Sequence, residues 1–257
     1  MPNRQLELQT MLQSLRLPMM AQVCAEWALK SAKEGLSHEA FLYELAQLEC
    51  ERRSQQRIER LLAQSGLPRE KTFATLRLER LPMPIRGQLE RLRSGEFVKE
   101  AINVVAVGPP GVGKSHVLAA LAHDLVRQGY AVLWTPTAQL MQRLLAAKGD
   151  LRLPQELVKL HRYACLVLDD IGYVQHDQDE MEVLFTLLSD RYEQRSVCLS
   201  TNLVFSEWER IFKNPLTTVA AIDRVVHHSV LLDMMQVHSF RVQQAAGQET
   251  PEGLARS

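Results

Sequence analysis

The chain lacks long apolar runs, a cysteine framework and any excess of charge of one sign. No apolar run approaches the roughly 18 residues of a membrane-spanning helix, so we expect no membrane span. The N-terminal residues MPNRQLELQTML do not resemble a secretory signal, and the expected location is the cytoplasm. The 30 basic and 30 acidic side chains give zero net charge, so composition alone does not indicate a nucleic-acid partner.

The cysteines and histidines form no metal or disulfide pattern in the sequence. No C-x-x-C pair is present, so we interpret the four cysteines as core residues of a protein in a reducing compartment. These are Cys24, Cys50, Cys165 and Cys198. The histidines are dispersed apart from the adjacent pair His227–His228, and we read no zinc site from them. No arrangement of Ser, Cys and His indicates a catalytic nucleophile.

The length of 257 residues, with 46% apolar residues, allows one full core and a small appended domain. Residues 1–67 show helical periodicity and predict a small N-terminal helical domain. Residues 68–243 alternate apolar runs with helical segments, which predicts an α/β domain with helices on both faces of a parallel sheet. The polar tail, residues 244–257, is expected to be disordered.

Five apolar runs predict the strands of this sheet. They are residues 104–107, 130–135, 165–168, 196–201 and 229–234. Ligands of such sheets bind at the carboxyl ends of the strands. The polar residues that follow these runs are therefore the first candidates for a functional site.

The stretch from Val104 to Ser115, VVAVGPPGVGKS, has the G-x-x-x-x-G-K-S spacing of a phosphate-binding loop between a strand and a helix. Glycines let backbone N–H groups close on phosphate oxygens, Lys114 would reach the β- and γ-phosphates, and the Ser115 hydroxyl would bind Mg²⁺. The pattern therefore predicts ATP and Mg²⁺ as cofactors. The candidate nucleotide-binding residues are Gly108, Pro109, Pro110, Gly111, Val112, Gly113, Lys114, Ser115 and His116.

Two further motifs follow predicted strands. Asp169 and Asp170 end the third run in the manner of a Walker B motif, so Asp169 would hold Mg²⁺ and Asp170 would orient the attacking water. Asp170 is one methylene shorter than a glutamate, and we predict slow hydrolysis. The amide of Asn202, after the fourth run, could hold the γ-phosphate or the lytic water.

An arginine from a neighbouring subunit would complete such a site, because catalysis of phosphoryl transfer is mostly charge stabilisation. Arg224 is the main candidate, and its alternative is a helix-surface arginine that pairs with a carboxylate. Arg191 and Arg241 are weaker candidates for the same role.

Several runs together resemble the IstB-like branch of the AAA+ ATPases, the helper proteins of two-gene insertion sequences. These runs are GPPGVGKSH, LVLDDIGY, SDRYEQRSVCLSTNLVFSEW and AAIDRVVHHSVLL, and the resemblance covers roughly residues 8–243. It implies an ATP-dependent homo-oligomer, a ring or filament on double-stranded DNA, with a transposase of the same element as partner. It also implies that Asn202 is sensor 1 and that Arg224 is an arginine finger acting in trans.

The resemblance adds candidates for DNA contact. The segment before the Walker B motif is similar to an insertion that faces DNA in initiator proteins, which implies roles for Lys148, Arg152, Lys159 and Arg162. The N-terminal helices would meet the transposase or a neighbouring subunit. The chain departs from many AAA+ proteins because no C-terminal helical lid fits after the last strand, so Arg241 is not assigned a second sensor role.

The sequence favours a transposition helper, and three other functions remain open. The main alternative is a loader of a replicative helicase, similar to DnaC. The loader would stack bases of single-stranded DNA on aromatic side chains, and the insert offers only Tyr163. A metabolic P-loop kinase would need an acceptor pocket and a lid, which we do not find. The last is a nucleotide-gated scaffold with negligible turnover.

Overall fold

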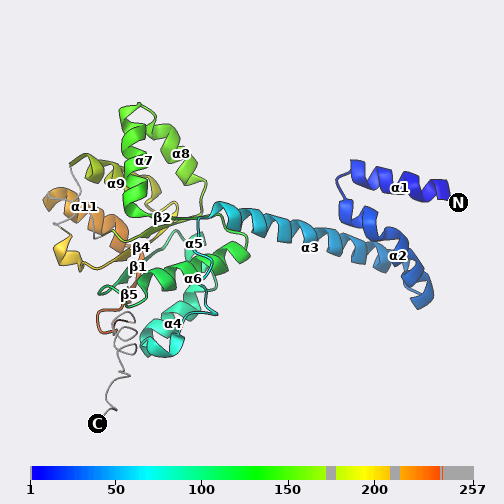
Figure 1. The fold of residues 1–257 in the computed structure, drawn as a ribbon, viewed down its shortest axis with the longest axis horizontal. Helices are drawn as coiled ribbons and strands as arrows, with labels where there is room; N and C mark the ends of the chain where they lie inside the picture. The colour runs from blue at the N-terminus through cyan, green and yellow to red at the C-terminus, as the bar shows by residue number, and fades with distance from the viewer. Residues whose placement is uncertain (1, 172–177, 209–214, 238, 240–257) are drawn as a thin grey trace, which may run out of the picture. The chain divides into compact units, whose positions relative to one another are not determined.

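A computed structural model describes residues 2–171, 178–208, 215–237 and 239 (Figure 1). The chain divides into two compact units, Met1–Arg60 and the residues from Leu61 onward. The division falls within one long helix, α3 (His38–Gln64). The expected domain limit at residue 67 stays a prediction. Arg241 and the tail 244–257 lie outside the described residues.

The first unit consists of α1 (Pro2–Ser14), α2 (Pro18–Glu34) and the first part of α3. Proline at the start of α2 has the fixed φ that a first helical residue needs. Ser37 caps α3, because its Oγ accepts a hydrogen bond from the Ala40 N–H at 3.1 Å. These local signals set where the helices begin.

A buried carboxylate joins α2 to α3. Glu49 Oε2 accepts hydrogen bonds from the N–H groups of Met19 (2.8 Å) and Met20 (3.3 Å), and Arg53 pairs with Glu49 Oε1 at 3.0 Å. Burial alone would raise the pKa of Glu49, but these hydrogen bonds lower it below its ordinary value. The first turn of α2 is thus capped from another helix rather than from its own sequence.

The second unit contains a five-stranded parallel sheet in the order β2-β3-β4-β1-β5. The strands are β1 (Asn103–Val107), β2 (Val132–Pro136), β3 (Cys165–Asp169), β4 (Ser196–Thr201) and β5 (Ser229–Asp233). The expected class and strand number are confirmed, and β4 has the predicted limits. The other four strands differ from the predictions only at their ends.

Helices cover both faces of the sheet, as expected (Figure 1). Among the described residues of this unit, the α-helices and 3-10 turns are η1 (Leu78–Arg80), α4 (Met83–Leu92), α5 (Glu96–Lys99), α6 (Lys114–Arg127), α7 (Thr137–Gly149), α8 (Leu153–His161), α9 (Gln178–Arg191), η2 (Phe205–Glu207) and α11 (Pro215–Val226). Helix α6 packs on one face, while α7, α9 and α11 pack on the other. Within the described ranges, no helix is long and apolar enough to cross a bilayer.

The core lies between the sheet and its helices. Alternate strand residues such as Val105, Leu168 and Leu199 pack with Leu140 of α7 and Leu184 of α9. Strand side chains alternate between faces, so their neighbours along each strand point toward α6. Burying each such side chain stabilises the fold by about 1.5–3 kcal/mol. This packing fixes the strand ends that carry the polar motifs.

The cysteines divide between core and surface. Cys165 and Cys198 are buried with their sulfur atoms 3.4 Å apart, in accordance with the expected core role. The hydrogen bond with Cys165, together with burial, raises the pKa of Cys198, which disfavours its thiolate. The expectation is wrong for Cys50, which is exposed on α3.

The segment between α3 and β1 is held against the sheet edge and α6. The N–H of Trp134 donates to Ser65 O at 2.7 Å, so the chain after α3 covers the edge strand β2. Gly66 has φ +69°, and a Cβ there would lie 2.9 Å from Trp134 O. Further on, His116 Nε2 lies 3.1 Å from both Thr72 O and Thr75 Oγ1. This segment therefore lies beside the start of α6.

Candidate nucleotide-binding site

The loop between β1 and α6 requires glycine at three positions. Gly111 and Gly113 have φ values of +83° and +98°, in the left-handed region that side chains disfavour. Gly108 has no such φ, but a Cβ at this position would lie only 2.8 Å from Met234 O, next to β5. The loop thus follows a close backbone path that leads into the first turn of α6, where unpaired N–H groups favour anions.

Lys114 lies over this loop. Its Nζ donates to Gly108 O (2.6 Å) and Pro109 O (3.0 Å), and the residue is only 9% exposed. An ammonium group held against the loop carbonyls is placed to meet a phosphate that the loop binds. Ser115 follows in the first turn of α6 and is half-buried.

Asp169 and Asp170 are tied to the neighbouring strand β4 by one hydroxyl. Ser200 Oγ donates to Asp169 Oδ1 at 2.7 Å and accepts the Asp170 N–H at 2.8 Å. Asp170 has φ +65°, a conformation that Asp tolerates better than most residues. The sequence reasoning missed Ser200, although a Ser-Thr pair that ends a buried apolar strand is a usable signal.

The same strand end also holds the phosphate loop. The Gly108 N–H donates to Thr201 O at 3.2 Å, and Thr201 is the register partner of Val107. Asn202 comes next, and its Oδ1 is buried without a hydrogen-bond partner in the described structure. An unpaired buried acceptor fits a site that receives a donor such as a water molecule. Gly108, Asp169 and Asn202 thus share the carboxyl edge of the sheet, as the sequence predicts.

The side chain of His116 does not join this edge. Its hydrogen-bond contacts are with Thr72 and Thr75 of the preceding segment. Only its backbone remains for the predicted contact with nucleotide.

Arg224 lies near the amino ends of the strands, opposite the carboxyl ends that carry the phosphate loop. The first residue of β1, Asn103, donates from Nδ2 to Arg224 O at 3.3 Å, so this part of α11 lies near the amino ends of the strands. A five-residue strand spans about 16 Å, which separates Arg224 from its own phosphate loop. Its guanidinium donates to Ala220 O and lies 4.6 Å from the Phe185 ring centre. Any contact of Arg224 with ATP would be in a neighbouring subunit.

The suggestion that Arg191 is an arginine finger is wrong. This residue is 1% exposed, and its guanidinium donates to the carbonyls of Leu160 (3.1 Å), Tyr163 (3.0 Å) and Ser196 (3.0 Å). Burial lowers the pKa of Arg191 to about 10. Arg191 joins three chain segments inside the core and cannot reach a ligand.

Three of the four predicted DNA-contacting cations are held in ion pairs. Lys148 pairs with Asp179 (2.8 Å) and Glu182 (2.9 Å), and hydrogen bonds to these carboxylates raise the pKa of Lys148. Lys159 pairs with Glu156 at 3.0 Å, and Arg152 pairs with Asp150. The fourth, Arg162, is exposed. These carboxylates offset much of the positive charge that the sequence suggests.

Several relatives with similar sequences are ATP-binding proteins of insertion sequences. The chain is 39% identical to an insertion-sequence ATP-binding protein of Sinorhizobium fredii, covering 90% of this chain and 78% of that protein. It is 33% identical to the ATP-binding protein of insertion sequence IS21 of Pseudomonas aeruginosa, covering 89% and 86%.

Solved structures share the fold at low identity. DnaI matches with a TM-score of 0.55 at 18% identity, covering 66% of this chain and 95% of that one. AMPPCP-bound DnaA from Aquifex aeolicus matches with a TM-score of 0.55 at 14% identity, covering 72% and 57%. The α/β unit therefore has the AAA+ P-loop fold.

The family described as IstB-like ATP binding protein matches residues 10–247. This range includes the phosphate loop, the two aspartates and Asn202. The chain therefore belongs to the IstB-like ATP-binding proteins and is an ATP-binding AAA+ protein.

Proposed function

We propose that this protein is a slow, oligomerisation-dependent ATPase that assembles on double-stranded DNA and recruits a transposase to its target. The single observation that supports ATP-dependent action most strongly is the attachment of Asp169 and the phosphate loop to adjacent residues of β4. The insertion-sequence origin of the relatives supports the transposase as partner. DNA binding and assembly are carried over from the family resemblance.

The residues at the carboxyl edge fit ATP with Mg²⁺. Lys114 would turn from the carbonyls of Gly108 and Pro109 toward the β- and γ-phosphates. Ser115 and Asp169 would hold Mg²⁺, which neutralises charge on the phosphates when bound. Ser200 would keep the Asp169 carboxylate oriented for that task.

Hydrolysis requires a water that is held in line with the γ-phosphate. Asp170 would accept a hydrogen bond from this water, and the unpaired Asn202 Oδ1 would accept a second. Arg224 of an adjacent subunit would add positive charge, which makes turnover depend on assembly. A site that is complete only between subunits suits a switch better than a fast enzyme.

A substitution of the phosphate-loop lysine tests the proposal. Lys114→Ala should abolish binding of a fluorescent ATP analogue with Mg²⁺ and also abolish nucleotide-dependent assembly on duplex DNA. Lys99→Ala is the matched control, because Lys99 is an exposed lysine paired with Glu96 on α5. Binding is measured by fluorescence anisotropy, and assembly by sedimentation or electron microscopy. Equal duplex occupancy and equal particle size without nucleotide would refute the proposal.

A preference for duplex or single-stranded DNA distinguishes the transposition helper from the helicase loader. A transposition helper should prefer duplex over single-stranded DNA of equal length in the presence of ATP, with affinity that falls steeply as salt rises. A loader should prefer the single strand and should bind a replicative helicase. Preference for single-stranded DNA would therefore favour the alternative.

A further inference from the structure

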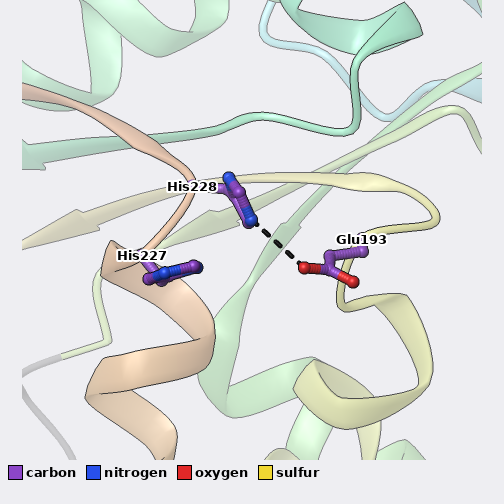
Figure 2. A group of neighbouring side chains, drawn as sticks. All are labelled: Glu193, His227 and His228. Atoms are coloured by element: carbon purple, nitrogen blue, oxygen red, sulfur yellow. Dashed lines mark hydrogen bonds and ion pairs between the residues drawn. The ribbon is translucent and has the colours of Figure 1, made fainter.

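Glu193, His227 and His228 converge at the surface of the α/β unit (Figure 2). One ring nitrogen from each histidine and one carboxylate oxygen all lie within 4.8 Å of one another. His228 Nε2 and Glu193 Oε1 are 3.1 Å apart, and the two imidazole rings are 4.4 Å apart at 78°. Thirty-four positions separate Glu193 from His227 in the sequence, so the histidine pair alone gives no metal pattern.

The backbone holds these residues at two fixed turns. Glu193 follows the end of α9, and its φ of +56° turns the chain toward β4. The histidine pair links α11 to β5: the His227 N–H donates to Asp223 O at 2.9 Å, and His228 O accepts the Asn103 N–H at 2.7 Å. These three exposed side chains can therefore rotate to meet a ligand, while the backbone keeps their Cα atoms at fixed separations.

The spacing suits a small divalent transition metal. Zinc lies about 2.0–2.2 Å from imidazole nitrogen and carboxylate oxygen, so tetrahedral ligand atoms are about 3.3–3.6 Å apart. The His228–Glu193 pair is already near that separation, and the remaining donor needs a shift of about 1 Å. Imidazole favours zinc and its neighbours over Mg²⁺ or Ca²⁺, which prefer oxygen ligands.

We propose that Glu193, His227 and His228 form a site for one zinc-class divalent cation, with water in the fourth position. The Tyr192 hydroxyl, 3.4 Å from His227 Nδ1, would orient that ring from outside the ligand set. The site lies near the amino ends of β4 and β5, opposite the edge that carries the phosphate loop. It is therefore separate from the Mg²⁺ of the nucleotide site and goes beyond the proposed ATPase.

A bound ion would join the end of α9 to the end of α11. Helix α11 carries Arg224, whose guanidinium already packs on Phe185 of α9. The cation would therefore hold α11 against α9. Under the proposed function, on which this step rests, α11 is the helix that offers Arg224 to the next subunit. The expected result is a higher melting temperature and a more uniform placement of Arg224.

Metal stoichiometry tests this site directly. The full-length protein, treated with a chelator and free of nucleotide, is dialysed against Zn²⁺ at pH 7.5, and bound metal is measured by mass spectrometry. We expect about one equivalent, and Co²⁺ should give the visible absorption of a tetrahedral centre. Glu193→Gln and His228→Ala should each weaken binding at least tenfold, whereas His38→Ala and Cys50→Ser should leave it unchanged.

Thermal unfolding separates loss of the site from loss of the fold. Without metal, Glu193→Gln should melt close to the unmodified protein, and only the unmodified protein should gain stability when Zn²⁺ is added. Equal Zn²⁺ stoichiometry and affinity in the double variant Glu193→Gln/His228→Ala would overturn the proposal. Absence of any bound metal in the unmodified protein would overturn it as well.

Discussion

Ser200 holds Asp169 in place, because its hydroxyl donates a 2.7 Å hydrogen bond to the Asp169 carboxylate and accepts the N–H of Asp170. The next residue, Thr201, accepts the N–H of Gly108 at the start of the phosphate loop. Two successive residues of β4 therefore connect the two motifs that flank it. Strain or movement at this strand end would change both motifs together.

Removal of the Ser200 hydroxyl should impair turnover more than nucleotide binding. Ser200→Ala removes this hydrogen-bond partner from the Asp169 oxygen and from the Asp170 N–H. The change should cost about 1–3 kcal/mol of folding stability. We expect kcat for ATP hydrolysis to fall about tenfold or more, with a smaller effect on nucleotide affinity. Ser206→Ala, at an exposed serine of η2, is the control. Unchanged kcat in Ser200→Ala would show that Asp169 needs no such support.

Arg224 should act only between subunits, because it lies at the amino edge of its own sheet. Arg224→Ala should retain ATP binding and lose most turnover. A mixture of Arg224→Ala and Lys114→Ala subunits should regain activity, since ATP on the intact phosphate loop of an Arg224→Ala subunit would let it assemble with a Lys114→Ala neighbour and receive that neighbour's arginine. Turnover is measured against the mixing ratio. An inactive mixture that still co-assembles would contradict a role in trans.

The carboxylates around Lys148 should limit its contact with DNA. Asp179 and Glu182 both pair with this lysine, so Asp179→Asn with Glu182→Gln should free its charge and strengthen duplex binding. Exposed ion pairs contribute little because water screens them, so we expect the affinity for duplex DNA to rise by about fivefold or less. Lys148→Gln should weaken binding and lower the salt slope by about one. If the Asp179→Asn/Glu182→Gln variant binds duplex DNA with unchanged affinity, Lys148 is not a DNA contact.

The N-terminal unit should lose stability at acidic pH through Glu49. The folded pKa of Glu49 is below its ordinary value of 4.5, so its contribution is fully present above that value and is lost as pH falls through the lowered pKa. Glu49→Gln should lower the free energy of unfolding of this unit by about 1–3 kcal/mol at neutral pH. It should also remove the loss of stability that protonation of Glu49 causes at acidic pH. Hydrogen exchange of the Met19 and Met20 amides reports the change.

The matched control for this change is Glu51→Gln, an exposed position on the same helix. At each pH from 3 to 7, the Met19 and Met20 amides of this variant should be as well protected from exchange as those of the unmodified protein. If the unmodified protein kept full protection of these amides at pH 3, Glu49 would not hold the first turn of α2.

Local patterns were sufficient for the elements and the motifs. The short apolar runs of the strands and the glycines of the loop favour particular backbone conformations wherever they occur, so β4 and the start of α6 could be predicted from neighbouring residues alone. Arg191 shows the limit of such reasoning. Its sequence neighbours suggest an exposed helix end, but the carbonyls that bury it come from residues 160–164 and 196.

The sequence by itself determined the class of fold, the family and the phosphate loop, because each depends on the spacing of residues close together in the chain. Only the tertiary structure decided which polar groups meet across strands and helix ends. Ser200 reaches Asp169 and Glu193 reaches His228 because parallel strands and packed helices bring together residues more than thirty positions apart. Such contacts depend on strand order and register, which local spacing does not encode.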